Sequence, residues 1–264
     1  LRRAIDEELA GLQGTDVDRA DLNGVTLLMR ACADGHEVRA RALLEAGAEI
    51  DKGDEADWTA LMFASASGHE QCARALLVKG ASLEAVSKDN FTMLMAASYG
   101  GLLSVVTQVL PLSDIDAAVV STHASQAGYT ALMYASSNGH ELCARALLEK
   151  GADMEKQTLK GNTALILSCE NGHDLCARAL LEAGASKDIK DSAGDTAATL
   201  VQQALAGAHM GVRCARSGMD PIVGNRYTLQ GEDLCESEFQ KLTSQEQRER
   251  ECIPPLTPSA SLSA

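Results

Sequence analysis

Aromatic side chains are scarce in this sequence, since Phe, Trp and Tyr together make up only 3% of it. Large β-sandwich and β/α-barrel cores draw on more aromatic and β-branched bulk, so this scarcity favours a helical fold packed with Ala and Leu. Long apolar runs are also missing, which excludes a membrane-spanning helix. Positive charge is short as well: 23 Lys and Arg face 37 Asp and Glu, for a net charge of −14. We therefore exclude nucleic acid and anionic membranes as partners.

Signatures of catalysis and of secretion are missing too. The chain has no Gly-x-Ser-x-Gly, no glycine-rich phosphate loop ending in Gly-Lys-Ser/Thr and no His-Glu-x-x-His, so we predict that it is not an enzyme. It begins Leu1-Arg2-Arg3 without an apolar signal core, and we expect it to be part of a longer protein. Eight cysteines without a secretion signal indicate reduced thiols and a cytoplasmic or nuclear location.

What the sequence has is a repeat. Threonines that open a run such as Thr-Ala-Leu-Met recur at spacings of 33, 33, 38, 33 and 33 residues. A glycine follows the first five threonines after nine residues, and in four repeats a histidine comes next. A Leu-Leu pair and then Gly-Ala close four of the repeats. The six threonines are Thr26, Thr59, Thr92, Thr130, Thr163 and Thr196.

Each repeat is typical of two short helices followed by a tight turn. The threonine is a helix-capping residue, and the Gly-His and Gly-Ala pairs are helix breaks. Two residues before each threonine stands a residue that tolerates a left-handed backbone. These residues are Gly24, Asp57, Asn90, Gly128, Gly161 and Gly194.

This pattern resembles the ankyrin repeat family, which has a 33-residue period and the signature Thr-Pro-Leu-His, Gly-His, Leu-Leu, Gly-Ala. The resemblance covers residues 20–205 and implies an all-α solenoid of paired short helices with hairpin turns. The signature histidine is replaced by Met29, Met62, Met95, Met133 and Ile166, so dispersion contacts must substitute for its hydrogen bond. The third repeat is irregular, because Pro111 interrupts its second helix and an enlarged loop is expected over 112–126.

The repeat pattern divides the chain into four parts. Residues 1–19 are interpreted as a degenerate half-repeat that caps the N-terminal end. Residues 20–206 hold five full repeats and a degenerate C-terminal cap, residues 207–243 form a small irregular segment, and residues 244–264 are expected to be disordered. The cysteines of the repeats recur at equivalent helix positions and are predicted to be small core side chains. The recurring histidines are interpreted as structural, because equivalent residues about 10 Å apart cannot share one zinc ion.

The resemblance also implies where a partner would bind. The residue before each threonine, and residues seven and eight positions after it, are expected on the concave surface of the solenoid. Large aromatic side chains dominate binding energy at many interfaces. The alternative is that these rings pack on neighbouring hairpins without any partner. The predicted binding residues, including polar and acidic neighbours, are Trp58, Phe91, Tyr99, Tyr129, Glu55, Asp89, Asn138, Asn162 and Glu170.

The segment 209–238 resembles a ZZ-type zinc finger in its framing motifs, which are His-Met-Gly-Val-Arg-Cys, Pro-Ile-Val-Gly-Asn-Arg-Tyr and Asp-Leu-Cys. Most of the expected zinc ligands are replaced, for example by Ser217, Leu229 and Glu238. Tetrahedral zinc needs four nitrogen or sulfur ligands, so we predict no bound metal and no cofactor. The remaining candidate ligands are Cys214, Cys235, His209 and Cys252.

The sequence as a whole predicts a monomeric, non-catalytic scaffold or adaptor that binds a protein or peptide, one that is basic and partly apolar. Two alternatives stay open. The chain is the substrate-recruiting part of a larger enzyme such as a ubiquitin ligase, or it is a zinc-dependent reader centred on the ZZ-like segment.

Overall fold

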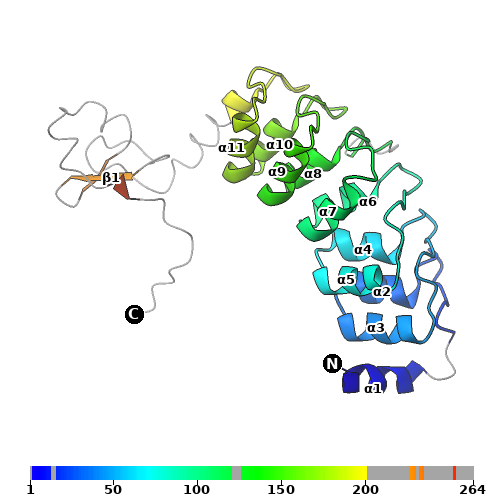
Figure 1. Ribbon diagram of the computed structural model, residues 1–264. Coiled ribbons are helices and arrows are strands. Elements are labelled where there is room, and N and C mark those ends of the chain that lie inside the picture. The colour runs from blue at the N-terminus through cyan, green and yellow to red at the C-terminus, as the bar shows by residue number, and fades with distance from the viewer. Residues whose placement is uncertain are drawn as a thin grey trace. The chain divides into compact units, whose positions relative to one another are not determined.

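The computed structural model describes residues 2–12, 16–120, 126–200, 226–229, 232–234 and 252–253. The chain divides into two compact units, Leu1–Ala197 and Ala198–Ala264. In the first unit, consecutive helix pairs stack into a curved array, with the connecting loops along one edge (Figure 1). This is the all-α ankyrin-type architecture that the repeat pattern predicts.

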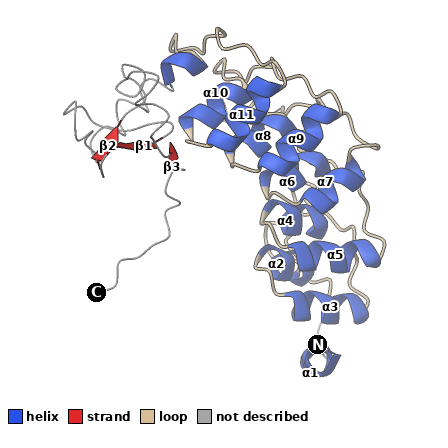
Figure 2. Ribbon diagram, turned by 60° about the vertical axis from the view of Figure 1, so that its left-hand side comes forward, coloured by secondary structure: helices blue, strands red, loops and turns tan. Residues whose placement is uncertain are grey.

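The helices of the first unit form two rows (Figure 2). The first helices of the repeats pack on one another in sequence and are α2 (Leu27–Ala33), α4 (Ala60–Ala66), α6 (Met93–Tyr99), α8 (Ala131–Ser137) and α10 (Ala164–Glu170). The second row contains α3 (Glu37–Glu45), α5 (Glu70–Val78), α7 (Leu103–Val109), α9 (Glu141–Glu149) and α11 (Asp174–Glu182). Helix α1 (Arg2–Leu12) packs against α3 and buries Ile5.

The repeated threonines begin the first helices as predicted. The side-chain oxygen of each accepts a hydrogen bond from the backbone N–H three residues later, which satisfies one of the donors left free at a helix start. The five donors are the backbone N–H groups of Met29, Met62, Met95, Met133 and Ile166. The same methionine and isoleucine side chains are almost fully buried between repeats, so apolar packing occupies the place of the missing histidine.

The turn before each threonine adopts the left-handed conformation that the sequence predicts. Asp57 and Asn90 have φ angles of 64° and 59°, and the four glycines at equivalent positions also have positive φ. At Gly24 the next hairpin approaches so closely that a Cβ atom would lie 2.8 Å from the backbone nitrogen of Glu55. Glycine at this position therefore serves both the turn and the contact between hairpins.

The histidines act between repeats rather than on their own helices. They stand at the first residue before α3, α5, α9 and α11, yet none caps its helix with its side chain. Instead the Nε2 atom of His69 lies 3.0 Å from the carbonyl oxygen of Ala33, and that of His140 lies 2.9 Å from the carbonyl oxygen of Tyr99. A Cβ atom at Gly35 or Gly101 would overlap the ring of the following repeat's histidine. The Gly-His pair is thus a contact between repeats, which is consistent with the structural role expected for it.

The irregular third repeat has a shortened second helix and a lengthened hairpin. Helix α7 ends at Val109, ahead of Pro111. The backbone N–H of Val119 bonds to the carbonyl oxygen of Tyr129, and eight residues lie between Val119 and Gly128. The hairpin before it has two residues, Lys88 and Asp89, at this place. The additional residues therefore lie between Val119 and Gly128, and 121–125 among them are outside the described part of the chain.

Beyond residue 200, the described parts of the second unit are three short strands in the order β2-β1-β3. Strand β1 (Arg226–Leu229) pairs antiparallel with β2 (Glu232–Leu234) and with β3 (Cys252–Ile253). The segment expected to be irregular thus contains a small sheet, and β3 lies in the range 244–264 that was expected to be disordered. Strands β1 and β3 contain Tyr227, Thr228 and Ile253, which are residue types that favour extended backbone.

Candidate protein-binding surface

The hairpins are held in a fixed row by two sets of hydrogen bonds. Within a hairpin, the first side chain accepts backbone N–H bonds from the turn; Asp54 Oδ1, for example, accepts from Ala56 and Trp58 at 2.9 and 2.8 Å. Between hairpins, backbone bonds join the tips, such as Glu55 N–H to Asn23 O at 3.0 Å and Lys88 N–H to Ala56 O at 3.0 Å. The residue that precedes each capping threonine is therefore placed at a defined point on successive repeats.

Six aromatic side chains from three consecutive repeats form one continuous cluster, called here the aromatic cluster. Trp58 stacks on Phe91 with ring centroids 4.9 Å apart, and it also contacts Phe63 at 5.3 Å. Tyr134 joins the remaining rings, since its centroid lies 5.3 Å from that of Phe91, 5.6 Å from Tyr99 and 5.0 Å from Tyr129. Tilted, edge-to-face and offset pairs at such distances are favourable ring geometries. The cluster comprises Trp58, Phe63, Phe91, Tyr99, Tyr129 and Tyr134.

The cluster has a buried layer and an open layer. Tyr134 and Phe91 are only 4% and 7% exposed, whereas Tyr99 is 45% exposed and Trp58 and Tyr129 are half-buried. Phe91, one of the predicted binding residues, is thus mostly covered, because Trp58 stacks on its ring and Tyr134 contacts it edge to face. Phe91 contacts Trp58 and Tyr134 within the cluster and exposes little surface of its own.

Two phenol groups in the cluster, those of Tyr134 and Tyr129, have raised pKa values. Burial, followed by the neighbouring Tyr129 and Tyr99, raises the pKa of Tyr134 above its ordinary value. The Tyr134 hydroxyl is buried and has no hydrogen-bond partner within the described part of the chain. Burial and the nearby Glu170 carboxylate likewise raise the pKa of Tyr129. The Tyr134 and Tyr129 hydroxyls are therefore uncharged at neutral pH.

The predicted polar residues lie around the cluster. Glu55 and Asp89 are exposed at the tips of two neighbouring hairpins. Asn138 is the C-cap of α8, and its Nδ2 group donates to the carbonyl oxygen of Tyr99 at 3.0 Å. This bond joins the fourth repeat to the one that carries the most exposed ring of the cluster.

Asn162 and Glu170 meet on the C-terminal side of Tyr129. The Asn162 amide donates to Glu170 Oε2 at 3.3 Å. Both side chains line a pocket of about 410 Å³ that also has Tyr129 on its wall. Burial, and then the charges of Asp191 and Asp195, raise the pKa of Glu170, while Lys160 lowers it. The structure thus brings these three predicted residues together in one concave site.

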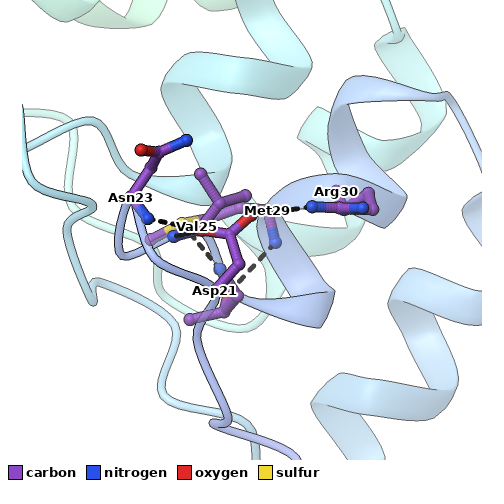
Figure 3. Close-up of polar contacts among 6 residues, drawn as sticks. Asp21, Asn23, Val25, Met29 and Arg30 are labelled. Atoms are coloured by element: carbon purple, nitrogen blue, oxygen red, sulfur yellow. Dashed lines mark hydrogen bonds and ion pairs between the residues drawn. The ribbon is translucent and has the colours of Figure 1, made fainter.

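The N-terminal end of the same row has a different chemistry. In the first repeat, Val25 and Arg30 occupy the positions that hold Trp58 and Phe63 in the second. Figure 3 shows the Arg30 guanidinium directed at Asp21, and the two groups form an ion pair at 2.8 Å. Asp21 also accepts backbone N–H bonds from Asn23 and Val25, which, with Arg30, lower the pKa of its carboxyl group. The aromatic surface therefore ends before the first repeat.

The thiols and candidate metal ligands do not form a reactive site in the described residues. Cys32, Cys72, Cys143, Cys169 and Cys176 are all free and buried, as predicted. Burial raises the pKa of Cys143 and of Cys176 to about 11, so these thiols stay protonated at neutral pH. The candidate zinc ligands Cys214, Cys235 and His209 lie outside the described residues, and Cys252 pairs with Tyr227 across the small sheet. No metal-binding group of His, Cys, Asp and Glu occurs among the residues that are described.

The family model for ankyrin repeats in three copies matches residues 4–89 and 93–191, which is well over half of the sequence. The chain belongs to the ankyrin repeat family. Its structure is similar to the crystal structure of the human ASB11 ankyrin repeat domain, with 26% sequence identity and a TM-score of 0.59. That likeness covers 78% of this chain and 95% of the ASB11 domain. A search of the curated proteins gave no significant match.

Family membership places general limits on the function. Ankyrin repeats generally mediate protein–protein interaction, and proteins of this family are generally non-catalytic binding domains. Within the described residues, none of the ankyrin-repeat helices has the length and apolarity that crossing a membrane requires.

Phe63 and Tyr134 are the residues that sequence reasoning missed. They share a helix position with Ala96 and Leu167 and were not included among the predicted binding residues. Tyr134 is buried, in keeping with an inward-facing helix position. The structure shows that each contacts the aromatic residue five positions earlier, at the end of its own hairpin. The recurrence of an aromatic pair at this five-residue spacing, Trp58 with Phe63 and Tyr129 with Tyr134, is the signal that would have revealed them.

Proposed function

We propose that this chain is a non-catalytic interaction scaffold that binds a protein or peptide on the open face of the aromatic cluster. The observation that carries the proposal is a row of Trp58, Tyr99 and Tyr129 that stays partly open above a buried layer of Phe91 and Tyr134. Half-buried Trp and Tyr rings of this kind dominate the binding energy at many interfaces. Because packing against Phe91 and Tyr134 already restricts these rings, binding incurs a smaller loss of side-chain conformational entropy.

The partner that fits this surface is basic and partly apolar. Apolar side chains of the partner would cover the rings, and basic side chains would face the acidic hairpin tips at Glu55 and Asp89. The sequence carries a net charge of −14, which further favours encounter with a cationic segment. We place the binding face on the concave side, as the family resemblance implies, and we propose that the chain acts as a monomer in the cytoplasm or nucleus without a cofactor.

The direct test is selection of binding peptides from a random library displayed on phage, with the full chain as bait. Affinities of the selected peptides are then measured by fluorescence polarisation for the wild type and for Trp58→Ala/Tyr129→Ala. The control variant is Leu142→Ala/Leu175→Ala, which truncates two leucines that are 63% and 55% exposed on α9 and α11. Circular dichroism confirms that each variant is folded.

We expect the aromatic variant to lose at least about tenfold in affinity, since truncating hot-spot aromatic residues costs about 2 kcal/mol or more. The control should bind as the wild type does. Equal binding by all three proteins, or loss only in the leucine variant, would place the binding site elsewhere.

The charge of the partner is tested through association rates. Glu55→Lys/Asp89→Lys should slow association of a basic selected peptide in low salt and leave the rate in high salt nearly unchanged, because salt screens exposed charges. A rate that does not change in low salt would contradict the acidic-tip part of the proposal.

The zinc-dependent alternative has its own measurement. Elemental analysis of the purified full chain, prepared without chelators, should find no stoichiometric zinc. One zinc ion per chain would favour the reader alternative centred on the ZZ-like segment.

A further inference from the structure

Beside Tyr129 the surface sinks into the pocket of about 410 Å³, which we call the Tyr129–Glu170 pocket. Its size is in the range of pockets that hold ligand groups. Tyr129 comes from the hairpin before α8, Glu170 from the end of α10, and the opposite wall from the two following hairpins. The residues used in the argument are Tyr129, Lys160, Asn162, Glu170 and Asp191.

The Glu170 carboxylate in this pocket forms no ion pair among the described residues. Its hydrogen bond within the described part of the chain comes from the neutral Asn162 amide, and no lysine or arginine there forms an ion pair with it. The Asp191 carboxylate is already engaged, because its Oδ1 atom accepts the backbone N–H groups of Ala193 and Asp195 at 2.8 Å. Glu170 is therefore the acid in the pocket that is available to a ligand.

The charges near Glu170 are mainly negative. Its pKa is raised by burial first and then by Asp191 and Asp195, and only Lys160 opposes this. Lys160 stands on the pocket rim without an ion pair in the described structure. A cation that entered the pocket would stabilise the ionised carboxylate and reverse these effects.

The Tyr129 ring on the pocket wall favours a guanidinium group over an ammonium group. Tyr129 lies between the pocket and the rest of the aromatic cluster, since its ring contacts Tyr134 at 5.0 Å. A guanidinium group stacks on aromatic faces and also pairs with a carboxylate, whereas an ammonium group is a compact point charge. The site thus offers a flat ring and a carboxylate together, which suits arginine better than lysine.

We propose that the Tyr129–Glu170 pocket receives a basic side chain of the bound partner, with arginine preferred over lysine. The guanidinium lies against the Tyr129 ring and pairs with Glu170, which Asn162 holds in place. The inference rests on the proposed function, because it adds a specificity pocket at the C-terminal edge of the aromatic surface. It also explains why a partner that is partly apolar and partly basic fits this chain.

The pocket is tested without knowledge of the partner by NMR titration of the full chain. The probes are N-acetyl-arginine methylamide, the matched lysine compound and the neutral norleucine compound. We expect saturable shifts of the Tyr129 and Asn162 amide signals, with affinity on the order of millimolar and strongest for arginine. Glu170→Gln retains an oxygen acceptor for Asn162 and should abolish the preference for the charged probes.

Two further variants sharpen the test. Lys160→Ala removes the competing cation on the rim and should tighten arginine binding a few-fold, which a merely structural role of Glu170 would not produce. Glu149→Gln makes the same charge change at the exposed end of α9 and should leave the titration unchanged. Equal shifts with arginine and norleucine probes, or arginine binding that survives Glu170→Gln, would overturn the proposal.

Failure of the pocket and failure of the aromatic surface give different results. If selected peptides lose affinity with Trp58→Ala/Tyr129→Ala but not with Glu170→Gln, the binding surface stands and the arginine pocket is wrong. If the arginine probe binds and Glu170→Gln abolishes that binding, while the selected peptides bind Trp58→Ala/Tyr129→Ala as tightly as the wild type, the pocket proposal holds and the proposed function is wrong.

Discussion

The middle and the end repeats of this solenoid have the same helix caps and turns, but they differ in the side chains on either side of the capping threonine. Thr26 caps the first repeat by the same bond with which Thr92 caps the third. Around the capping threonine, however, the first repeat has Val25 and an Arg30 paired with Asp21, while the second repeat has Trp58 and Phe63 in ring contact. The difference shows that the repeat fold is set by caps and turns, and that its surface chemistry is free to change.

The end repeats also differ from one another. At the N-terminal end the charged Arg30 is neutralised by an acid within its own repeat. At the C-terminal end the acidic Glu170 has only the Asn162 amide as a hydrogen-bond partner in the described part of the chain. The charge at one end of the aromatic surface is thus paired within its own repeat, whereas the carboxylate at the other end has no ion pair among the described residues.

The largest expected effect separates the buried layer of the cluster from the ion pair of the first repeat. Phe91→Ala removes a ring that is 7% exposed and contacts both Trp58 and Tyr134, so we expect unfolding free energy to fall by about 3–5 kcal/mol. Arg30→Ala removes an ion pair whose arginine is mostly exposed, and it should cost less than about 1 kcal/mol. Urea unfolding followed by circular dichroism measures both; comparable losses would contradict the distinction between the two regions.

A smaller effect tests the shared framework. Thr26→Ala and Thr92→Ala each delete one cap bond to the backbone N–H three residues later, and each should cost about 1 kcal/mol. The same unfolding measurement applies, with Thr107→Ala on the exposed face of α7 as the control for the substitution itself. A loss at only one of the two caps would mean that the framework is not equivalent in the two regions.

The smallest effect concerns the buried hydroxyl at the centre of the cluster. Because Tyr134 lacks a hydrogen-bond partner in the described structure, Tyr134→Phe should leave stability at pH 7 unchanged within about 0.5 kcal/mol or raise it slightly. The pKa of Tyr134 is higher in the folded than in the unfolded protein. Ionisation of Tyr134 therefore has no effect on the free energy of unfolding below the unfolded pKa of about 10, and it lowers that free energy as the pH rises above this value.

The alkaline limb of the unfolding curve therefore distinguishes the two proteins. Wild type should lose stability above about pH 10 more steeply than Tyr134→Phe. The reason is that the phenol of Tyr134 loses its proton in the unfolded state at a pH where it is still protonated in the folded state, and this favours unfolding. Parallel pH profiles would show that the Tyr134 hydroxyl is satisfied in solution, for example by water.

The sequence was sufficient for the framework because each framework residue acts locally. A threonine caps the helix that follows it, and Asp57 or Asn90 tolerates the positive φ of its own turn. Spacing along the chain is enough to find such residues. The buried cysteines follow from the same repeat register, since equivalent positions face the same core.

The surface was less accessible to prediction because its geometry depends on contacts between repeats. The burial of Phe91 follows from a stack with Trp58, which lies 33 residues earlier in the chain. The Tyr129–Glu170 pocket requires hairpins from three repeats, and neither its depth nor its charge balance is visible in one repeat unit. Likewise, His140 bonds to Tyr99 of the preceding repeat, although its position next to a helix start suggests a local role.

The most direct test of the account compares one repeat position in the two regions. Affinity of a selected peptide is measured for wild type, Trp58→Ala and Val25→Ala, which truncate the residue before the capping threonine in the second and the first repeat. The account predicts a loss of at least about tenfold for Trp58→Ala and no significant loss for Val25→Ala. Equal losses, or a loss confined to Val25→Ala, would contradict the claim that the middle repeats carry the binding surface.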